Sequence, residues 1–140
     1  MSKTKELEIK LLTICDYATV AQDGKLSIIG VFDKIFVRDL PSTHLRMFLV
    51  CSLIGKENSD HKIKVSIKNS GGQEILINAP ELSTKMSPEG TGNITLDLVN
   101  LPLNLTGEYT VSLIEEGKPL GKTTFDVIRV KEKNEYGKPN

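Results

Sequence analysis

Four aspartates lie close together in the first third of the chain and are the first candidates for chemistry: Asp16, Asp23, Asp33 and Asp39. If the segments around Asp16 and Asp33 pair as a hairpin, these two carboxylates approach one another at one end of a sheet. Paired carboxylates bind calcium or act as acid and base, and with Tyr17 they form a speculative ligand-binding site. The alternative is that each aspartate caps a turn. The D-x-D-x-D-G spacing of a calcium loop is absent, so we predict neither a metal site nor a catalytic residue.

The two histidines, His44 and His61, are isolated in the sequence. Metal-binding sandwiches place several histidines and a carboxylate on one metal, with an H-x-H step along a strand. His44 follows Pro41 in a predicted connection, so we expect turn packing or a surface hydrogen bond. No G-x-S-x-G elbow, phosphate-binding loop or G-x-G-x-x-G fingerprint is present. A nucleophile assembled only in three dimensions stays open, and the sequence predicts a non-enzymatic protein without a cofactor.

Lysines and cysteines offer two further possibilities. Lys62, Lys64 and Lys68 form a basic strip along one strand face, which either contacts phosphates or is a solvated face that discourages edge pairing. Aromatic residues make up only 5% of the chain, which argues against stacking of bases, so we expect a solvated face and no nucleic-acid partner. Cys15 and Cys51 lie in apolar patterns, where cysteine acts as a small buried hydrophobe. We predict free thiols, near each other if their strands pair.

The elements that position these residues are strands, because the apolar residues alternate with a period of two. In the run 62–68, Ile63, Val65 and Ile67 point one way and polar side chains point the other. The same alternation marks runs at 94–98, 109–113 and 124–127. Strands with one dry and one wet face, without helical runs between them, predict an all-β fold. We expect an antiparallel two-sheet β-sandwich, immunoglobulin-like or jelly-roll-like.

Glycine-rich turn signals separate the runs at 22–25, 69–72 and 116–119, the second leading into the apolar run 74–77. Asp23-Gly24 is a strong signal for a two-residue hairpin, because type I′ turns need positive φ. Gly30 lies in mid-strand, which predicts a bulge or the close approach of another backbone.

Two later segments have distinct signals. Gly107 and Tyr109 resemble a tyrosine corner, in which the hydroxyl bonds back to nearby backbone. The segment 79–92 holds two prolines and two glycines. We expect it to be a long connection that crosses between sheets, pinned by Leu82 and Met86.

Two runs, 26–31 and 45–54, are apolar on both faces. Phe48 and Val50 lie on the second face of the longer run. Because an antiparallel sandwich leaves one face wet, we expect this second face to be covered, either by the connection around Leu82 or by a second copy of the chain. The sequence therefore predicts a protein partner, with self-association as a hypothesis.

The chain of 140 residues is 39% hydrophobic and 26% charged, which suits one globular domain. We expect a flexible N-terminus at 1–8, the β-sandwich domain at 9–130 and a disordered tail at 131–140. Lysine plus arginine equals aspartate plus glutamate at 18 each, so no global field attracts nucleic acid or an anionic membrane. The start lacks a signal-peptide pattern, and no apolar run approaches the roughly 20 residues that span a bilayer. We expect a cytoplasmic protein.

Short motifs run along most of the domain: D-Y-A at 16–18, D-G-K-L at 23–26, G-V-F-D at 30–33, P-x-x-H-x-x-M at 41–47 and G-x-Y-x-V at 107–111. Over residues 11–130 the chain resembles a family of small bacterial and phage-associated proteins catalogued only as a domain of unknown function. That family is similar to β-sandwich proteins in architecture. The resemblance therefore implies the fold and no activity.

Two function classes follow, with an enzyme in third place. The first is a non-enzymatic protein-interaction or structural module that binds another protein, or itself, through a sheet face or edge. The second is a small-ligand or carbohydrate-binding β-sandwich with a cleft near Asp16, Tyr17 and Asp33.

Overall fold

The computed structural model describes residues 6–131, which form strands and, within that range, no helix. Most of the predicted flexible N-terminus and nearly all of the predicted tail lie outside the described residues. The strands are β1 (Glu8–Val20), β2 (Leu26–Val31), β3 (Lys34–Val37), β4 (Ser42–Ile54), β5 (Asp60–Lys68), β6 (Glu81–Lys85), β7 (Thr91–Leu103), β8 (Gly107–Glu115) and β9 (Lys118–Arg129). No helix in the described part is long and apolar enough to cross a membrane.

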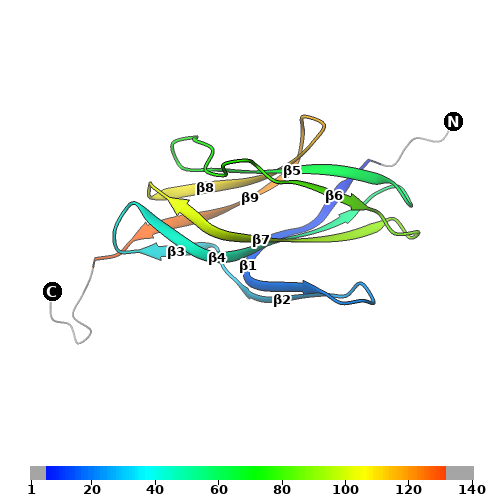
Figure 1. Cartoon of the computed structure of the whole chain (residues 1–140), viewed down its shortest axis with the longest axis horizontal. Coiled ribbons are helices and arrows are strands. Elements are labelled where there is room, and N and C mark those ends of the chain that lie inside the picture. The colour runs from blue at the N-terminus through cyan, green and yellow to red at the C-terminus, as the bar shows by residue number, and fades with distance from the viewer. Residues whose placement is uncertain (1–5, 132–140) are drawn as a thin grey trace.

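The strands form two stacked sheets, which confirms the predicted all-β sandwich (Figure 1). Sheet A has the order β2-β1-β4-β7 and sheet B the order β3-β9-β8-β5-β6. One pair departs from the antiparallel expectation, since β3 runs parallel to β9. The chain crosses from sheet A to sheet B after β2, and it enters sheet B in the same direction as β9.

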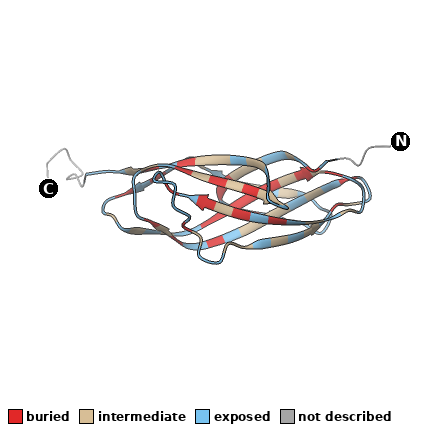
Figure 2. Ribbon diagram, turned by 90° about the horizontal axis from the view of Figure 1, so that it is seen from above, coloured by how far each residue is buried: buried red, intermediate tan, exposed pale blue. Residues whose placement is uncertain are grey.

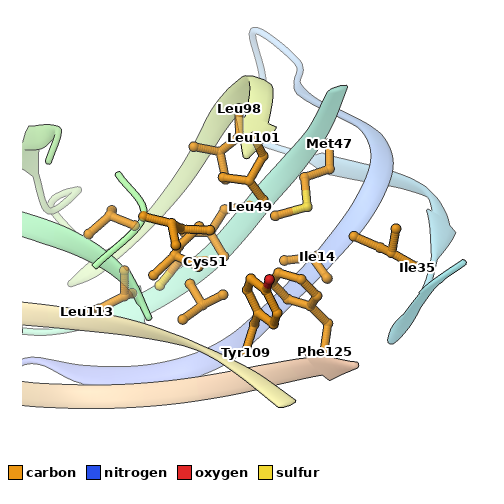
Figure 3. Close-up of a cluster of buried hydrophobic side chains, with 14 of the residues drawn as sticks. Ile14, Ile35, Met47, Leu49, Cys51, Leu98, Leu101, Tyr109, Leu113 and Phe125 are labelled. Carbon is orange, nitrogen blue, oxygen red and sulfur yellow. The ribbon is translucent and has the colours of Figure 1, made fainter. Parts of the chain in front are cut away.

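The core lies between the two sheets and is built by the alternation that the sequence shows (Figure 2). Ile63, Val65 and Ile67 of β5 are fully buried, whereas Lys62, Lys64 and Lys68 are exposed, as expected for a solvated strip. In the other sheet, the inner face of β4 contributes the buried side chains of Met47, Leu49, Cys51 and Leu53. Figure 3 shows the first three of these beside Leu98 of β7 and Leu113 of β8.

The second half of β1 and all of β2 form a hairpin that folds back over the outer face of sheet A. The first half of β1 pairs with β4 as far as Cys15, and the second half pairs only with β2. At the hairpin tip, Asn93 of β7 donates its side-chain amide to the Gly24 carbonyl oxygen at 3.0 Å. Gly24 therefore lies level with the start of β1, so the chain reverses direction after Cys15, as Figure 1 shows below sheet A.

This hairpin covers the second apolar face of β4. A separate buried cluster joins Cys15 and Ala18 of β1 to Phe48 and Val50 of β4, with residues 26 and 28 of β2 packed against it. The expected cover by the connection around Leu82 is wrong, because the Leu82 side chain packs against the main core; self-association stays a prediction. The prediction failed because the bend in β1 has no signal in the alternation of apolar residues.

The hairpin turn differs in type from the predicted one. The Gly24 amide donates to the Ala21 carbonyl oxygen at 2.9 Å, and Asp23 accepts from the Lys25 amide at 3.1 Å. Only Gly24 has positive φ, at 87°, so a four-residue turn with a left-handed glycine replaces type I′. The two-residue turn with positive φ at both positions lies instead between β8 and β9, at Glu116 (49°) and Gly117 (77°).

The predicted tyrosine corner is present. The Tyr109 hydroxyl donates to the Leu105 carbonyl oxygen at 2.7 Å and accepts from the Leu105 amide at 3.2 Å. Its ring stacks on Phe125 with centroids 5.1 Å apart (Figure 3). Gly107 has a φ of 109°, in the region that favours glycine, and a Cβ at this position would meet the Ser70 side chain.

Two segments differ from expectation. The connection 79–92 crosses between sheets as predicted and buries Met86, but it contains β6, which pairs with β5. The run 74–77 is not a strand beyond a single bridge at Glu74. The Glu74 carboxylate accepts hydrogen bonds from the amides of Ile67 (2.8 Å) and Leu76 (3.2 Å). These two amides are therefore not available for the backbone hydrogen bonds of a longer strand pair.

Both cysteines are free and buried, as predicted. Their strands pair, but the thiols lie on opposite faces of sheet A, with Cys51 in the main core and Cys15 under the hairpin. Burial raises the pKa of the Cys51 thiol to about 12 and also raises the pKa of Cys15. Neither side chain is therefore an activated nucleophile at neutral pH.

Candidate functional site

The bend of β1 brings together segments that are distant in the sequence. Gly30, with a φ of 72°, faces the Asp16 side chain so closely that a Cβ at position 30 would overlap the carboxylate. The predicted close approach at Gly30 is thus real, although its partner is a side chain and not a backbone. Glycine here is required both by φ and by the contact.

Beside the bend, two aromatic rings and an arginine form one cluster on the outer face of sheet A. The Tyr17 ring meets the Phe48 ring edge-on, with centroids 5.2 Å apart. The Arg46 guanidinium lies 5.2 Å from the same Phe48 centroid. Asp97 of β7 accepts from Arg46 Nε at 3.0 Å and Nη2 at 2.8 Å, and this bidentate pair fixes the guanidinium plane. The hydrogen bonds that Arg46 donates to Asp97, together with the negative charge of Asp97, raise the pKa of Arg46.

An exposed apolar residue adjoins this cluster. Val99 of β7 is directly opposite Arg46 in the sheet, which puts the two on one face, and it is 58% exposed. The hairpin covers sheet A only on the other side of Phe48, so this end of the outer face has no cover within the described chain. We call the surface formed by Tyr17, Arg46 and Val99 the Tyr17 face.

His44 lies just behind this surface. It belongs to β4, so its predicted place in a connection is wrong: the strand begins at Ser42, directly after Pro41. The imidazole is partly buried beside the Phe32 ring at 5.8 Å, and its Nε2 is buried without a hydrogen-bond partner in the described structure. Burial lowers the pKa of His44, against a smaller opposing effect of the Asp16 charge. His44 is therefore neutral at pH 7.

The predicted ligand site of Asp16, Tyr17 and Asp33 is divided among different contacts. Asp16 lies against Gly30 and Tyr17 against Phe48, while Asp33 forms an exposed ion pair with its neighbour Lys34 at 3.1 Å. A cavity of about 280 Å³ is lined by Asp33 but by neither Asp16 nor Tyr17. Whether these residues bind a ligand stays a prediction. Within residues 6–131, no three histidine, cysteine or acidic side chains are arranged to hold a metal ion.

At the opposite end of the sandwich, three polar side chains form a relay that sequence analysis missed. Nε2 of His61, at the start of β5, lies 2.7 Å from Ser59 Oγ, and Nδ1 of the same ring contacts the Glu115 carboxylate at the end of β8. A serine, a histidine and a carboxylate joined in this order are the arrangement of an activated nucleophile. His61 and Glu115 are 54 positions apart, so only a correct strand pairing could have revealed it.

The surroundings of Ser59 do not complete a nucleophilic site. The Ser59 hydroxyl also lies 2.6 Å from the Lys56 carbonyl oxygen, which accepts its proton. The nearest amides that could stabilise an oxyanion already have acceptors: Asn58 donates to Ser87 and Ser59 donates to Lys56. A cleft of about 700 Å³ is lined by His61 and Glu115, but the residues that line it do not include Ser59. The relay joins the start of β5 to the end of β8.

Comparison with known proteins adds the fold and no activity. A family model described as a family of unknown function matches residues 10–128. No curated protein matches the chain.

Solved structures resemble this chain in fold at low sequence identity. The Pseudomonas fluorescens alkylpurine DNA glycosylase AlkC, bound to DNA containing an abasic site analogue, has a TM-score of 0.52 at 15% identity, over 88% of this chain and 30% of that one. The β-D-glucoside glucohydrolase of Trichoderma reesei has a TM-score of 0.53 at 10% identity, over 88% of this chain and 19% of that one. An immunoglobulin-like protein of Pseudomonas aeruginosa has a TM-score of 0.46 at 17% identity, over 90% and 99%. The chain thus spans less than a third of the two enzymes, and these likenesses concern the fold alone.

Proposed function

This chain belongs to DUF6941, a family of unknown function, and from that premise we propose that it is a non-enzymatic protein-interaction module that binds through the Tyr17 face. The observation that carries the proposal is the fixed arginine–aromatic cluster beside an exposed apolar side chain. Tyrosine and arginine are the residue types most enriched at the energetic centres of protein interfaces. Both side chains are already held in place here. Arg46 contacts Asp97 and Phe48, and Tyr17 contacts Phe48, so little side-chain entropy is lost on binding.

The expected partner is a folded protein with an apolar patch and hydrogen-bond acceptors. Val99 supplies the apolar contact, and Arg46 keeps guanidinium hydrogens that Asp97 does not use. The outer face of sheet B is a poorer candidate, because exposed lysines and hydroxyl side chains cover it. A cytoplasmic location is part of the proposal, and the two free, buried thiols support it.

A small polar ligand is the second candidate, and the cleft of about 700 Å³ favours it. Apart from the His61 imidazole, its lining consists of charged and hydroxyl side chains, among them Asp60 and Lys62, and it includes no phenylalanine, tyrosine or tryptophan. Small-molecule sites are mostly apolar and aromatic with a few polar groups. The protein-interaction module is therefore the better-supported function, and a thermal-shift screen with sugars tests the alternative, because a ligand of the native state raises the melting temperature.

The test of the main proposal is affinity capture from an extract of the source organism with matched variants. We expect a partner that the wild-type chain retains and that Arg46→Ala and Tyr17→Ser lose, each by roughly 30-fold in affinity, the size of a typical hot-spot effect. Ile77→Lys is the control and should retain the partner, because it places a charge at a residue that is 87% exposed and lies in the connection between β5 and β6. Partners that all four proteins retain equally would contradict the proposal.

A further inference from the structure

The two sheets have four edge strands in the described part of the chain: β2 and β7 in sheet A, and β3 and β6 in sheet B. An edge strand presents unpaired backbone N–H and C=O groups that pair readily with another extended chain. Proteins protect such edges with charged side chains, prolines, bulges or short strands.

Three of the four edges carry this protection. β6 has charged, exposed residues at both ends, Glu81 and Lys85. β3 is only four residues long. β7 carries the charge of Asp97, a left-handed residue at Asn100 and a proline at 102. Each of these features hinders the addition of a regular strand.

β2 lacks this protection. Its sequence, Leu-Ser-Ile-Ile-Gly-Val, contains no charge and no proline, and among the described strands it pairs only with β1. Ile29 is 60% exposed and Val31 is also exposed. The left-handed Gly30 is its one irregularity, next to the last residue of the strand. In Figure 1, β2 forms the lower margin of the molecule, away from the stacked sheets.

We propose that β2 pairs antiparallel with β2 of a second copy of this chain, across a two-fold axis at Ile29. Residues directly opposite in an antiparallel pair share one face. This register places Ile29 opposite Ile29 of the second copy and Ser27 opposite Val31. The apolar side chains that each copy exposes on β2 then become neighbours, and β2 itself brings no charged residue into the interface. The two hairpins together form one four-stranded layer. A two-fold axis makes the same patch serve on both copies, as in most homodimers.

The dimer and the proposed function rest on different residues, so they can be tested separately. The dimer uses the free edge of β2, whereas Arg46 and Val99 of the Tyr17 face lie on β4 and β7; Tyr17 itself is directly opposite Ile29 in the β1–β2 pair, so the two surfaces adjoin. Arg46→Ala should therefore leave the dimer unchanged, so the failure of one proposal is distinguishable from the failure of the other.

The experiment is sedimentation velocity from micromolar to near-millimolar concentrations. We expect a monomer–dimer equilibrium in which Ile29→Lys raises the dissociation constant at least about tenfold, because like charges directly opposite repel. Ile77→Lys is the control and should dimerise like the wild type. Melting curves check that each variant is folded, as expected for substitutions at exposed positions.

The two-fold axis also gives a sharper test. Ile29→Lys and Ile29→Glu should each be monomeric alone and should form a mixed dimer when combined, because lysine then lies opposite glutamate. A wild-type chain that stays monomeric throughout, a dimer insensitive to Ile29→Lys, or a mixture without recovery would each overturn the proposal.

Discussion

The Asn93 side-chain amide donates to the Gly24 carbonyl oxygen at 3.0 Å and joins residues 69 positions apart. This contact ties the tip of the β1–β2 hairpin to β7 across the outer face of sheet A. Beneath the hairpin, Phe48 and Val50 are buried although they face away from the sandwich core. The hairpin therefore acts as a third layer, and its position sets which apolar residues of sheet A remain available to a partner.

Phe48→Ala tests how much the contact between the hairpin and sheet A contributes to the free energy of unfolding. Phe48 is 7% exposed and contacts Tyr17 and Arg46, so we expect its truncation to lower the free energy of unfolding by about 3–5 kcal/mol. Phe36→Ala, at a residue 61% exposed, is the control and should change it by about 0.5 kcal/mol or less. Urea denaturation measures both. Equal effects would mean that the hairpin does not bury Phe48.

The sequence predicts the two-sheet core well because Ile63, Val65 and Ile67 report their burial through local alternation. It predicts the hairpin at Asp23-Gly24 because the residue types of a tight turn are also a local signal. It does not predict that β1 reverses after Cys15, because the alternation of apolar residues continues through that point and carries no signal for a bend.

The strand β6 escapes notice because Pro80 precedes it and its own residues are mostly polar. It is a strand only because β5 offers it a partner. The relay of Ser59, His61 and Glu115 is hidden for a related reason, since the two sides of the contact come from strands far apart in the chain. The local alternation of apolar residues thus predicts individual strands, whereas β6 and the relay depend on which strands pair with each other.

Tyr109→Phe should lower the free energy of unfolding, because it removes the hydroxyl group that bonds to the backbone of Leu105. The oxygen donates to the Leu105 carbonyl and accepts from the Leu105 amide, and its removal leaves both backbone groups without that partner. We expect a loss of about 1–3 kcal/mol. Tyr17→Phe, on an exposed tyrosine, is the matched control and should be nearly neutral. A Tyr109→Phe protein as stable as the wild type would show that the corner contributes nothing.

Stability should depend on pH through His44. Burial lowers the pKa of its folded form below the ordinary value of 6.5, so the unfolded chain binds a proton more readily than the folded one. The stability is therefore complete above pH 6.5 and decreases as the pH falls from 6.5 toward the folded pKa. His44→Phe should flatten this slope in urea titrations at several pH values. An unchanged slope in the variant would assign the pH dependence to other groups.

The relay at the other end should behave as a structural link. We expect Glu115→Gln to lower the free energy of unfolding by about 1.5–3 kcal/mol, because it weakens a charge-assisted hydrogen bond to His61. Glu116→Gln, at an exposed turn residue, should change it by about 0.5 kcal/mol or less. A fluorophosphonate probe followed by mass spectrometry should leave Ser59 unmodified. A covalent adduct on Ser59 would contradict the non-enzymatic proposal.

The most direct test of the three-layer arrangement is a nuclear Overhauser measurement between methyl groups in dilute solution. If the hairpin covers sheet A, the Ala18 and Ile28 methyls should show cross-peaks to the Val50 methyls, since these side chains pack in one cluster. Val50 methyls without such cross-peaks and accessible to a soluble paramagnetic probe would contradict the account.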